Sequence, residues 1–172
     1  MSRDTPSITT TARRLLDICL LRATPQELPR SWELFGLTLI ASLGLSYPAA
    51  LAYGPGAKPM AEILAGLLFT LGFIYGTLAF RGFKVRFIQT ASAVFGTDAI
   101  ITLAALPALH AISMGAAQDT FTLLAMAGIG IWNLLVLGHI LRHALALPFP
   151  GGILVALGYI LGSVFISQLI LG

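Results

Sequence analysis

Five apolar stretches, each long enough to cross a lipid bilayer as a helix, dominate this sequence. A membrane-spanning helix needs about 20 apolar residues, because each residue adds about 1.5 Å along the helix axis. The five stretches are residues 32–53, 60–80, 87–112, 121–141 and 152–171. Only 10% of the 172 residues are charged, whereas a soluble domain carries about 25%. We therefore expect an all-α fold, a polytopic membrane helical bundle of five transmembrane helices preceded by a short amphipathic surface helix.

The chain divides into an N-terminal segment, residues 1–30, and a transmembrane domain, residues 31–172. Within the first part, residues 11–23 have the pattern of an amphipathic helix. Its polar side carries Arg13, Arg14 and Asp17, and its apolar side carries Leu15, Leu16 and Cys19. A helix of this length is too short to span a bilayer. It either lies on the membrane surface with its apolar side down or docks on the bundle itself, and the sequence leaves both alternatives open.

Several side chains are placed to cap the predicted helices. Thr24 and Glu27 are three residues apart, which is the spacing of a capping box. Ser31 precedes the first apolar stretch, and either Asp119 or Thr120 precedes the fourth. Because these residue types are favoured at the N-cap, we expect them to mark helix starts.

The basic residues fall almost entirely on one side of the predicted bundle. Of the ten Lys and Arg residues, only Lys58 falls on the other side when five crossings are drawn. The remaining nine are Arg3, Arg13, Arg14, Arg22, Arg30, Arg81, Lys84, Arg86 and Arg142. Since cytoplasmic loops carry the excess of Lys and Arg, we predict a cytoplasmic N-terminus and a C-terminus on the opposite side. A four-crossing alternative, with the third stretch re-entrant at Gly96-Thr97, would place Arg142 outside.

The third stretch carries an acid, Asp98, near its middle. A carboxylate at that depth in a membrane is costly and needs a partner or a proton. Counted inward from the cytoplasmic end of each stretch, Ser42, Thr70, Asn133 and Ser163 lie at similar depths, about 12–17 Å. We predict a hydrogen-bonded network centred on Asp98. Asn133 is the favoured partner, because its amide both donates and accepts.

This predicted network has two interpretations. In the functional one, Asp98 and its neighbours form an intramembrane site for a proton or a ligand. In the structural one, the same groups only hold helices together through interhelical hydrogen bonds. The sequence Gly96-Thr97-Asp98 also permits a break in the helix, which is a feature of some transporter sites.

His139 and His143 are four residues apart, so they share one face of a helix near its cytoplasmic end. That spacing is compatible with a metal ion, but Ile140 follows His139 where a metalloprotease motif would have glutamate. These histidines are therefore weak metal candidates, and we expect contact with a loop or with lipid headgroups instead. We expect no cofactor. No catalytic motif is present, which argues against an enzyme, and Lys and Arg form no cluster away from membrane-flanking positions, which argues against nucleic-acid binding.

Pairs of small residues four apart occur in two stretches. Gly72 and Gly76 permit close helix contact in the second stretch. In the fifth, Gly158 and Gly162 serve internal packing or contact with another membrane protein, including a second copy of this chain, equally well.

The layout resembles the Yip1-domain family of five-helix membrane proteins. Local similarities are the run Leu20, Leu21, Arg22 and Pro25, the opening Phe87-Ile88-Gln89 of the third stretch, and Ile131-Trp132 in the fourth. The resemblance implies a membrane scaffold or adaptor without catalytic chemistry. The Asp-Leu-Tyr-Gly-Pro motif of eukaryotic members is absent, so Rab-partner binding does not transfer.

The function predicted from the sequence is that of a non-enzymatic integral membrane protein, a scaffold or adaptor acting through partner or lipid contacts. The alternative is a small transporter or transporter subunit that uses Asp98 as a proton or ligand site. The short loops favour a bacterial inner-membrane protein.

Overall fold

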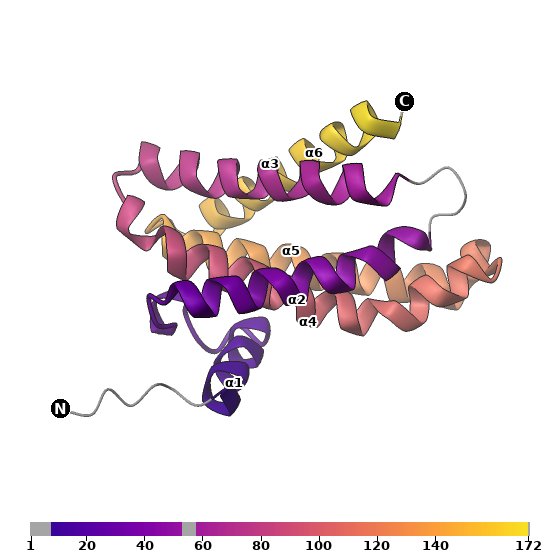
Figure 1. Cartoon of the computed structure of the whole chain (residues 1–172), viewed down its shortest axis with the longest axis horizontal. Coiled ribbons are helices and arrows are strands. Elements are labelled where there is room, and N and C mark those ends of the chain that lie inside the picture. The colour runs from indigo at the N-terminus through magenta and orange to yellow at the C-terminus, as the bar shows by residue number, and fades with distance from the viewer. Residues whose placement is uncertain (1–7, 53–57, 172) are drawn as a thin grey trace.

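The computed structural model describes residues 8–52 and 58–171. These residues form six α-helices, three short 3-10 helices and no strand (Figure 1). The α-helices are α1 (Ile8–Cys19), α2 (Trp32–Leu51), α3 (Pro59–Phe80), α4 (Phe87–Ser113), α5 (Thr120–Ala144) and α6 (Phe149–Leu171). The last five are long and apolar enough to cross a membrane, so the predicted all-α fold with five membrane-length helices is confirmed.

The helix bounds differ slightly from the predicted ones. Among the five long helices, the largest differences are in α5, which continues three residues beyond 141, and in α6, which begins three residues before 152. The predicted end of the first stretch at residue 53, residues 1–7 and residue 172 lie outside the described residues.

Helix α4 is the centre of the bundle. In the most apolar 18-residue stretch of α4, 56% of the residues are buried. In the corresponding stretches of the other four long helices, only 6–22% are buried. It contacts α1, α2, α3 and α5, and Figure 1 shows α2, α4 and α5 as one layer with α3 and α6 above it. The stretch that carries Asp98 is therefore the one around which the others pack.

Helix α4 is also continuous. It runs for 27 residues without interruption, which is about 40 Å at 1.5 Å per residue. The hydroxyl of Thr97 donates to the carbonyl of Ala93 at 2.8 Å, a bond within the same helix. The predicted break at Gly96-Thr97-Asp98 is therefore wrong, and no re-entrant turn exists in this part of the described chain.

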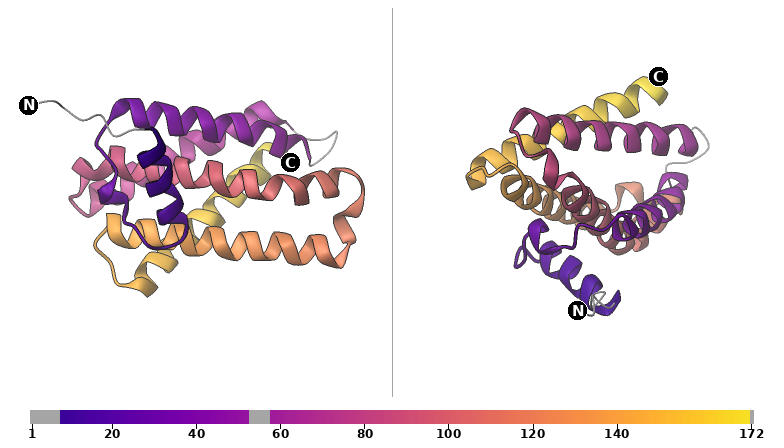
Figure 2. Two further views of the ribbon diagram at one scale, coloured as in Figure 1. Left: turned by 90° about the horizontal axis from the view of Figure 1, so that it is seen from below. Right: turned by 60° about the vertical axis from the view of Figure 1, so that its left-hand side comes forward.

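Helix α1 docks on the protein. It ends at Cys19, four residues before the predicted end at 23, and buries Leu15, Ile18 and Cys19, with Ile18 0% and Cys19 2% exposed. Leu16, which the sequence placed on the same side, is 49% exposed. Figure 2 shows the helix lying across α4. The close approach uses Gly96 of α4, where an added Cβ would lie 2.6 Å from a methyl group of Leu15. Of the two sequence alternatives, the structure has the docked one.

The segment between α1 and α2 begins with the predicted capping box. The backbone N–H of Thr24 donates to the Glu27 carboxylate at 2.8 Å. Ser31 caps α2 by accepting from the N–H of Leu34, and Asp119 caps α5 in the same way. These three predicted caps are confirmed, with Asp119 rather than Thr120 at the N-cap.

Side-chain amides tie this segment to the bundle. Gln89 of α4 donates to the carbonyl of Leu28 at 2.7 Å, and Gln26 donates to the carbonyl of His143 at 2.7 Å. The guanidinium of Arg86 donates to the carbonyl of Ala144 at 3.0 Å. The last carbonyls of α5 therefore find donors from the N-terminal segment and from the start of α4, which is favourable at a helix C-terminus.

Close helix contacts occur at Gly162, which belongs to the second predicted pair, and at Gly138, but not at Gly72 and Gly76. An added Cβ at Gly72 or Gly76 would meet nothing within 4 Å, so close packing of this pair inside the chain is wrong. Gly138 of α5 instead lies against Ile153 of α6, and Gly162 of α6 lies against the ring of Phe69 on α3.

Candidate functional site

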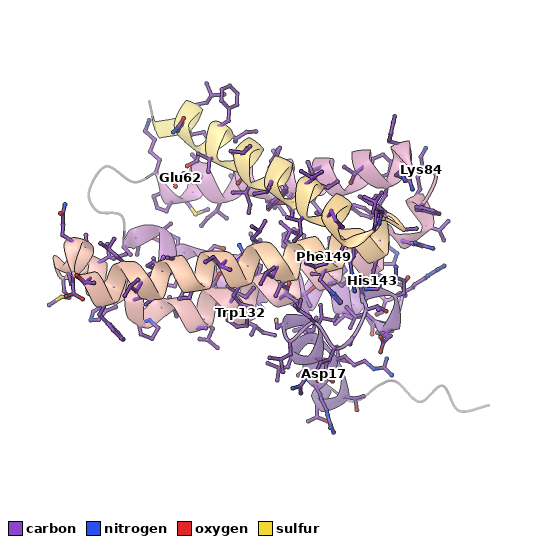
Figure 3. All side chains as sticks on the ribbon, turned by 180° about the vertical axis from the view of Figure 1, so that it is seen from behind. Asp17, Glu62, Lys84, Trp132, His143 and Phe149 are labelled. Carbon is purple, nitrogen blue, oxygen red and sulfur yellow. The ribbon has the colours of Figure 1, made fainter. Side chains whose placement is uncertain are left out.

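We call the end of the bundle where α2 begins and α5 ends the near end. The opposite end, where α2 ends and α3 begins, is the far end. Figure 3 shows Lys84 and His143 at the near end and Glu62 at the far end. Asp98 lies between them, eleven residues into α4 from Phe87.

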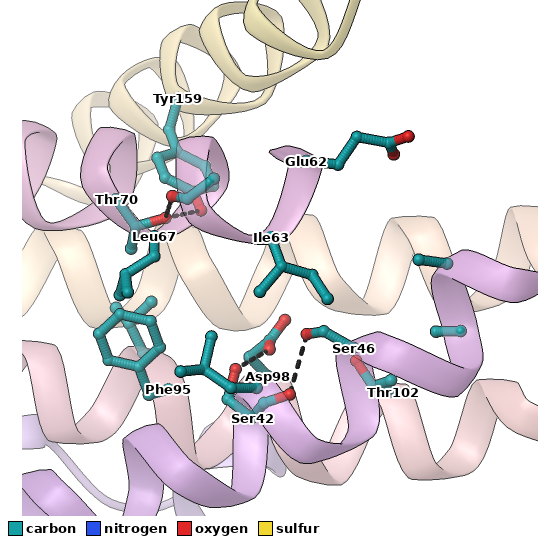
Figure 4. Close-up of a pocket in the computed structure, with 15 residues that line it drawn as sticks. Ser42, Ser46, Glu62, Ile63, Leu67, Thr70, Phe95, Asp98, Thr102 and Tyr159 are labelled. Atoms are coloured by element: carbon teal, nitrogen blue, oxygen red, sulfur yellow. Dashed lines mark hydrogen bonds between the residues drawn. The ribbon is translucent and has the colours of Figure 1, made fainter. Parts of the chain in front are cut away.

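The carboxylate of Asp98 accepts a hydrogen bond from the hydroxyl of Ser42 on α2. The donor–acceptor distance is 2.6 Å (Figure 4). Ser42 itself is buried, and its carbonyl accepts from the hydroxyl of Ser46 one turn further along α2 at 2.8 Å. A hydroxyl-to-carboxylate bond of this length is charge-assisted when the acid is ionised. Ser42 therefore fixes the position of the Asp98 carboxyl.

Asp98 lines a cavity of about 310 Å³ between α2, α3, α4 and α6. Its polar lining comes from all four helices and comprises Ser42, Ser46, Glu62, Thr70, Asp98, Thr102 and Tyr159. Its apolar lining includes Ile63, Leu67 and Phe95, which Figure 4 shows around the acid. The carboxyl group thus borders open space instead of being enclosed entirely by packed side chains.

The second hydrogen bond of the cavity joins Thr70 of α3 to Tyr159 of α6. Their hydroxyl oxygens are 2.8 Å apart, and Thr70 also donates to the carbonyl of Gly66. The ring of Tyr159 stacks on Phe69, with 5.5 Å between the ring centroids, and meets Phe73 edge-on. These aromatic contacts hold the Tyr159 hydroxyl at the cavity wall.

Two of the predicted network residues lie elsewhere. Asn133 is half-buried on α5, and among the described residues no hydrogen bond joins it to Asp98, because α5 contributes no residue to this cavity. Ser163 donates to the carbonyl of Ile160 in its own helix and lines a smaller neighbouring cavity between α3 and α6. The structure thus brings Ser42 to Asp98, places Thr70 on the same cavity, and separates Asn133 and Ser163 from it.

Sequence reasoning missed four polar residues of the cavity: Ser46, Glu62, Thr102 and Tyr159. Ser46 and Thr102 each lie four residues after a predicted member, Ser42 and Asp98. Helical residues four apart share a face, so this spacing was the signal that could have found them.

The histidine pair faces the N-terminal segment. His139 is buried, and its Nε2 lies 2.9 Å from the carbonyl oxygen of Ala23. The His139 and His143 rings meet edge-on with 4.7 Å between centroids. Within the described residues, no three His, Cys, Asp or Glu side chains are grouped as metal ligands. His139 is therefore a packing residue that contacts the loop.

The bundle is packed tightly at its near end and loosely at its far end. On α2 the buried residues are Leu34, Thr38 and Ser42, and on α3 they are Thr70, Ile74 and Leu78. Every residue of α4 from 89 to 97, in its near half, is buried. By contrast, no residue from 43 to 52, in the far half of α2, or from 58 to 69, in the far half of α3, is buried. The cavity around Asp98 therefore begins where the tightly packed near half of the bundle ends, and it lies in the loosely packed far half.

No family model matches the chain, and no curated protein and no solved structure matches it either. The site's chemistry therefore has to be judged from its own geometry. A carboxyl group with one hydroxyl partner, bordering a partly polar cavity, can hold a proton or a small cation. The cavity therefore has the groups of a binding site.

Proposed function

We propose that this chain is an integral membrane protein whose cavity around Asp98 binds a proton or a small cation within the bilayer. The five long helices cross the membrane with the N-terminus in the cytoplasm of a bacterial cell. The single observation that carries the proposal is the cavity itself, since an acid that only joins two helices needs no open space beside it. An ionisable residue inside a membrane helix is a functional candidate by default.

The energetic argument supports the same conclusion. A lone charge at the centre of a membrane helix costs about 2.5–3.5 kcal/mol on insertion scales. The one hydrogen bond from Ser42 returns about 1.5–3 kcal/mol at most, as a bond to a charged group. Bound to a proton or a cation, the carboxyl group loses most of this cost, so the site favours occupation.

The test is ion flux in liposomes that contain the purified protein. We expect a trapped pH-sensitive dye to report proton entry driven by a pH gradient, or a trapped cation indicator to report cation entry. Asp98→Asn should reduce the flux to that of empty liposomes, because the amide keeps the shape and loses the titratable group.

Asp119→Asn is the matched control, since asparagine also caps a helix and Asp119 lies outside the cavity at the start of α5. Flux that is equal in the wild type and in Asp98→Asn would contradict the proposal.

A scaffold or adaptor is the second candidate, favoured by the way the N-terminal segment is fixed. Hydrogen bonds from Gln26, Gln89 and Trp132 attach it to α4 and α5, so the near end presents one firm surface with Arg13 and Arg22 exposed. For this candidate, a bound membrane protein should be lost on Arg13→Glu with Arg22→Glu, while the fold stays intact.

A further inference from the structure

We infer that, in the conformation of this structure, water and small cations reach Asp98 from the far end of the bundle while the near side is closed, and that Glu62 marks the entrance of this route. This inference rests on the proposed function, because it names the path to the same site and one further residue of it. Three observations carry it: the course of the cavity, the packed layer behind it and the position of Glu62.

The cavity runs lengthwise from Asp98 toward the far end. On α2 its lining extends from Ser42 to Ala50, the second-last residue of that helix, and on α3 from Thr70 back to Glu62 in the first turn. Eight residues of helix correspond to about 12 Å. The lining therefore covers most of the distance from the middle of the bundle to its far end.

The near end has a cavity of its own, of about 770 Å³ between α1, α2 and α4, but Asp98 does not line it. Directly behind the cavity of Asp98 stand Thr38 on α2 and Ile74 on α3, which are 3% and 1% exposed, and then Leu78, also 1% exposed. The stretch of α4 from 89 to 97 is buried throughout. Protein interiors packed in this way leave few voids larger than a water molecule, so this layer separates the cavity of Asp98 from the near end.

Glu62 stands where two cavities meet. It lines the cavity of Asp98 and also the smaller one between α3 and α6 that contains Ser163 and Ser167. One oxygen of its carboxylate accepts from the backbone N–H of Lys58 at 3.2 Å. A negative charge at the mouth of a cleft with low-dielectric walls raises the local concentration of cations. Glu62 would thus attract cations at the mouth, and Asp98 would bind them further in.

The test is the rate of cysteine modification from each side of the membrane. In a Cys19→Ala background, single cysteines replace Ser46 inside the cavity and Ile74 in the packed layer. The probe is a membrane-impermeant cationic methanethiosulfonate, applied to right-side-out and to inside-out vesicles. The distribution of Lys and Arg assigns the far end to the outer side of right-side-out vesicles.

We expect Ser46→Cys to react in right-side-out vesicles about tenfold faster or more than in inside-out vesicles, since only an accessible thiolate reacts. Ile74→Cys should react slowly in both. Equal rates from the two sides, or a faster rate from inside-out vesicles, would overturn one-sided access. So would reaction of Ser46→Cys with a lipid-soluble maleimide alone, because that result means the cavity opens to lipid and not to water.

The entrance is tested by adding Glu62→Gln to Ser46→Cys. At low ionic strength the cationic reagent should lose about two- to threefold in rate, while an anionic methanethiosulfonate gains, because a charge nearby acts through electrostatic steering. Unchanged rates for both reagents remove Glu62 from the route. These outcomes are distinct from those of the flux experiment: one-sided labelling with no Asp98-dependent flux rejects the proposed function, and flux with two-sided labelling rejects the route.

Discussion

The two carboxyl oxygens of Asp98 have different surroundings. One accepts from Ser42 at 2.6 Å, and the other has no protein partner among the described side chains. Ser46 does not extend the chain of hydroxyls, since its hydrogen bond goes to the backbone carbonyl of Ser42. A single hydroxyl therefore orients the acid and leaves half of it free for a proton or a cation.

Cys19 is the residue that best reports whether α1 is docked. It is the one cysteine of the chain, its side chain is 2% exposed, and burial raises the pKa of its thiol from 9.0 to about 11. At pH 7.5 we expect iodoacetamide to react about 100-fold more slowly with the protein in mild detergent than in denaturing detergent, because the thiolate is the nucleophile. The rate for the folded protein should rise about tenfold per pH unit up to pH 10.

Mass spectrometry of the intact protein measures both rates on the same sample. Equal rates in the two detergents would mean that α1 leaves the bundle in solution. The same burial argues against the reversible palmitoylation that a cysteine close to a membrane otherwise permits.

The predictions for single residues gave the depth of each side chain in the bundle correctly, but they did not give the direction in which it points from its helix. The count of residues from each helix end placed Asp98, Ser42 and Thr70 at one level, and the structure has all three on one cavity. The same count placed Asn133 at that level, but α5 packs on another side of α4. The depth of a residue follows from the number of residues between it and the end of its helix. The neighbour that its side chain faces depends on how the helices pack, and a single sequence does not reveal this packing.

At the scale of elements, helix α4 and helix α1 depend on one another. Leu15 and Ile18 of α1 cover the first half of α4, and Gly96 allows the two helices to approach. The helices themselves were predictable, because apolar length and caps such as Ser31 are local properties. The docking of α1 was not, since an amphipathic helix fits a membrane surface and a protein surface equally well.

Gly96→Leu should displace α1 from α4. A Cβ at this position would lie 2.6 Å from Leu15 and 3.1 Å from a methyl group of Thr38, and overpacking of this kind costs about 1–3 kcal/mol. We expect a lower midpoint of thermal unfolding in detergent and faster alkylation of Cys19. Differential scanning fluorimetry and mass spectrometry provide the two measurements.

The matched control is Gly72→Leu, because nothing lies within 4 Å of an added Cβ there. This variant should keep Cys19 protected and should not lower the midpoint, since glycine is about 1 kcal/mol less favourable than alanine within a helix. If Gly96→Leu matches this control in both measurements, the close approach of α1 is refuted.

At the scale of the whole molecule, the bundle is two layers joined firmly at one end. Near that end α5 and α6 cross at Gly138 and Ile153, and Arg81 of the α3–α4 connection donates to the carbonyl of Leu145 at 3.3 Å. At the far end Lys58 donates to the carbonyl of Ile170, which links the start of α3 to the end of α6 within one layer.

Topology reporters should show the near end in the cytoplasm. Nine of the ten basic residues fall on the near side when five helices cross, so fluorescent-protein fusions after Lys84 and after Ala146 should be fluorescent. An alkaline phosphatase fusion after Gly115 should be active, because that enzyme requires the opposite compartment. An active phosphatase after Ala146 would instead support four crossings and contradict the orientation proposed above.

The docking of α1 also has a consequence for how the chain is made. Its contact partners come late in synthesis: the Cys19 carbonyl meets Trp132, and the Ala23 carbonyl meets His139, at separations of 113 and 116 residues. Helix α1 therefore has no place to dock until α4 has been made, and its hydrogen bonds to α5 form later still. The side chains of Leu15 and Ile18 stay uncovered during that interval, so a chain truncated before α4 keeps an exposed helix that quality-control proteases can recognise.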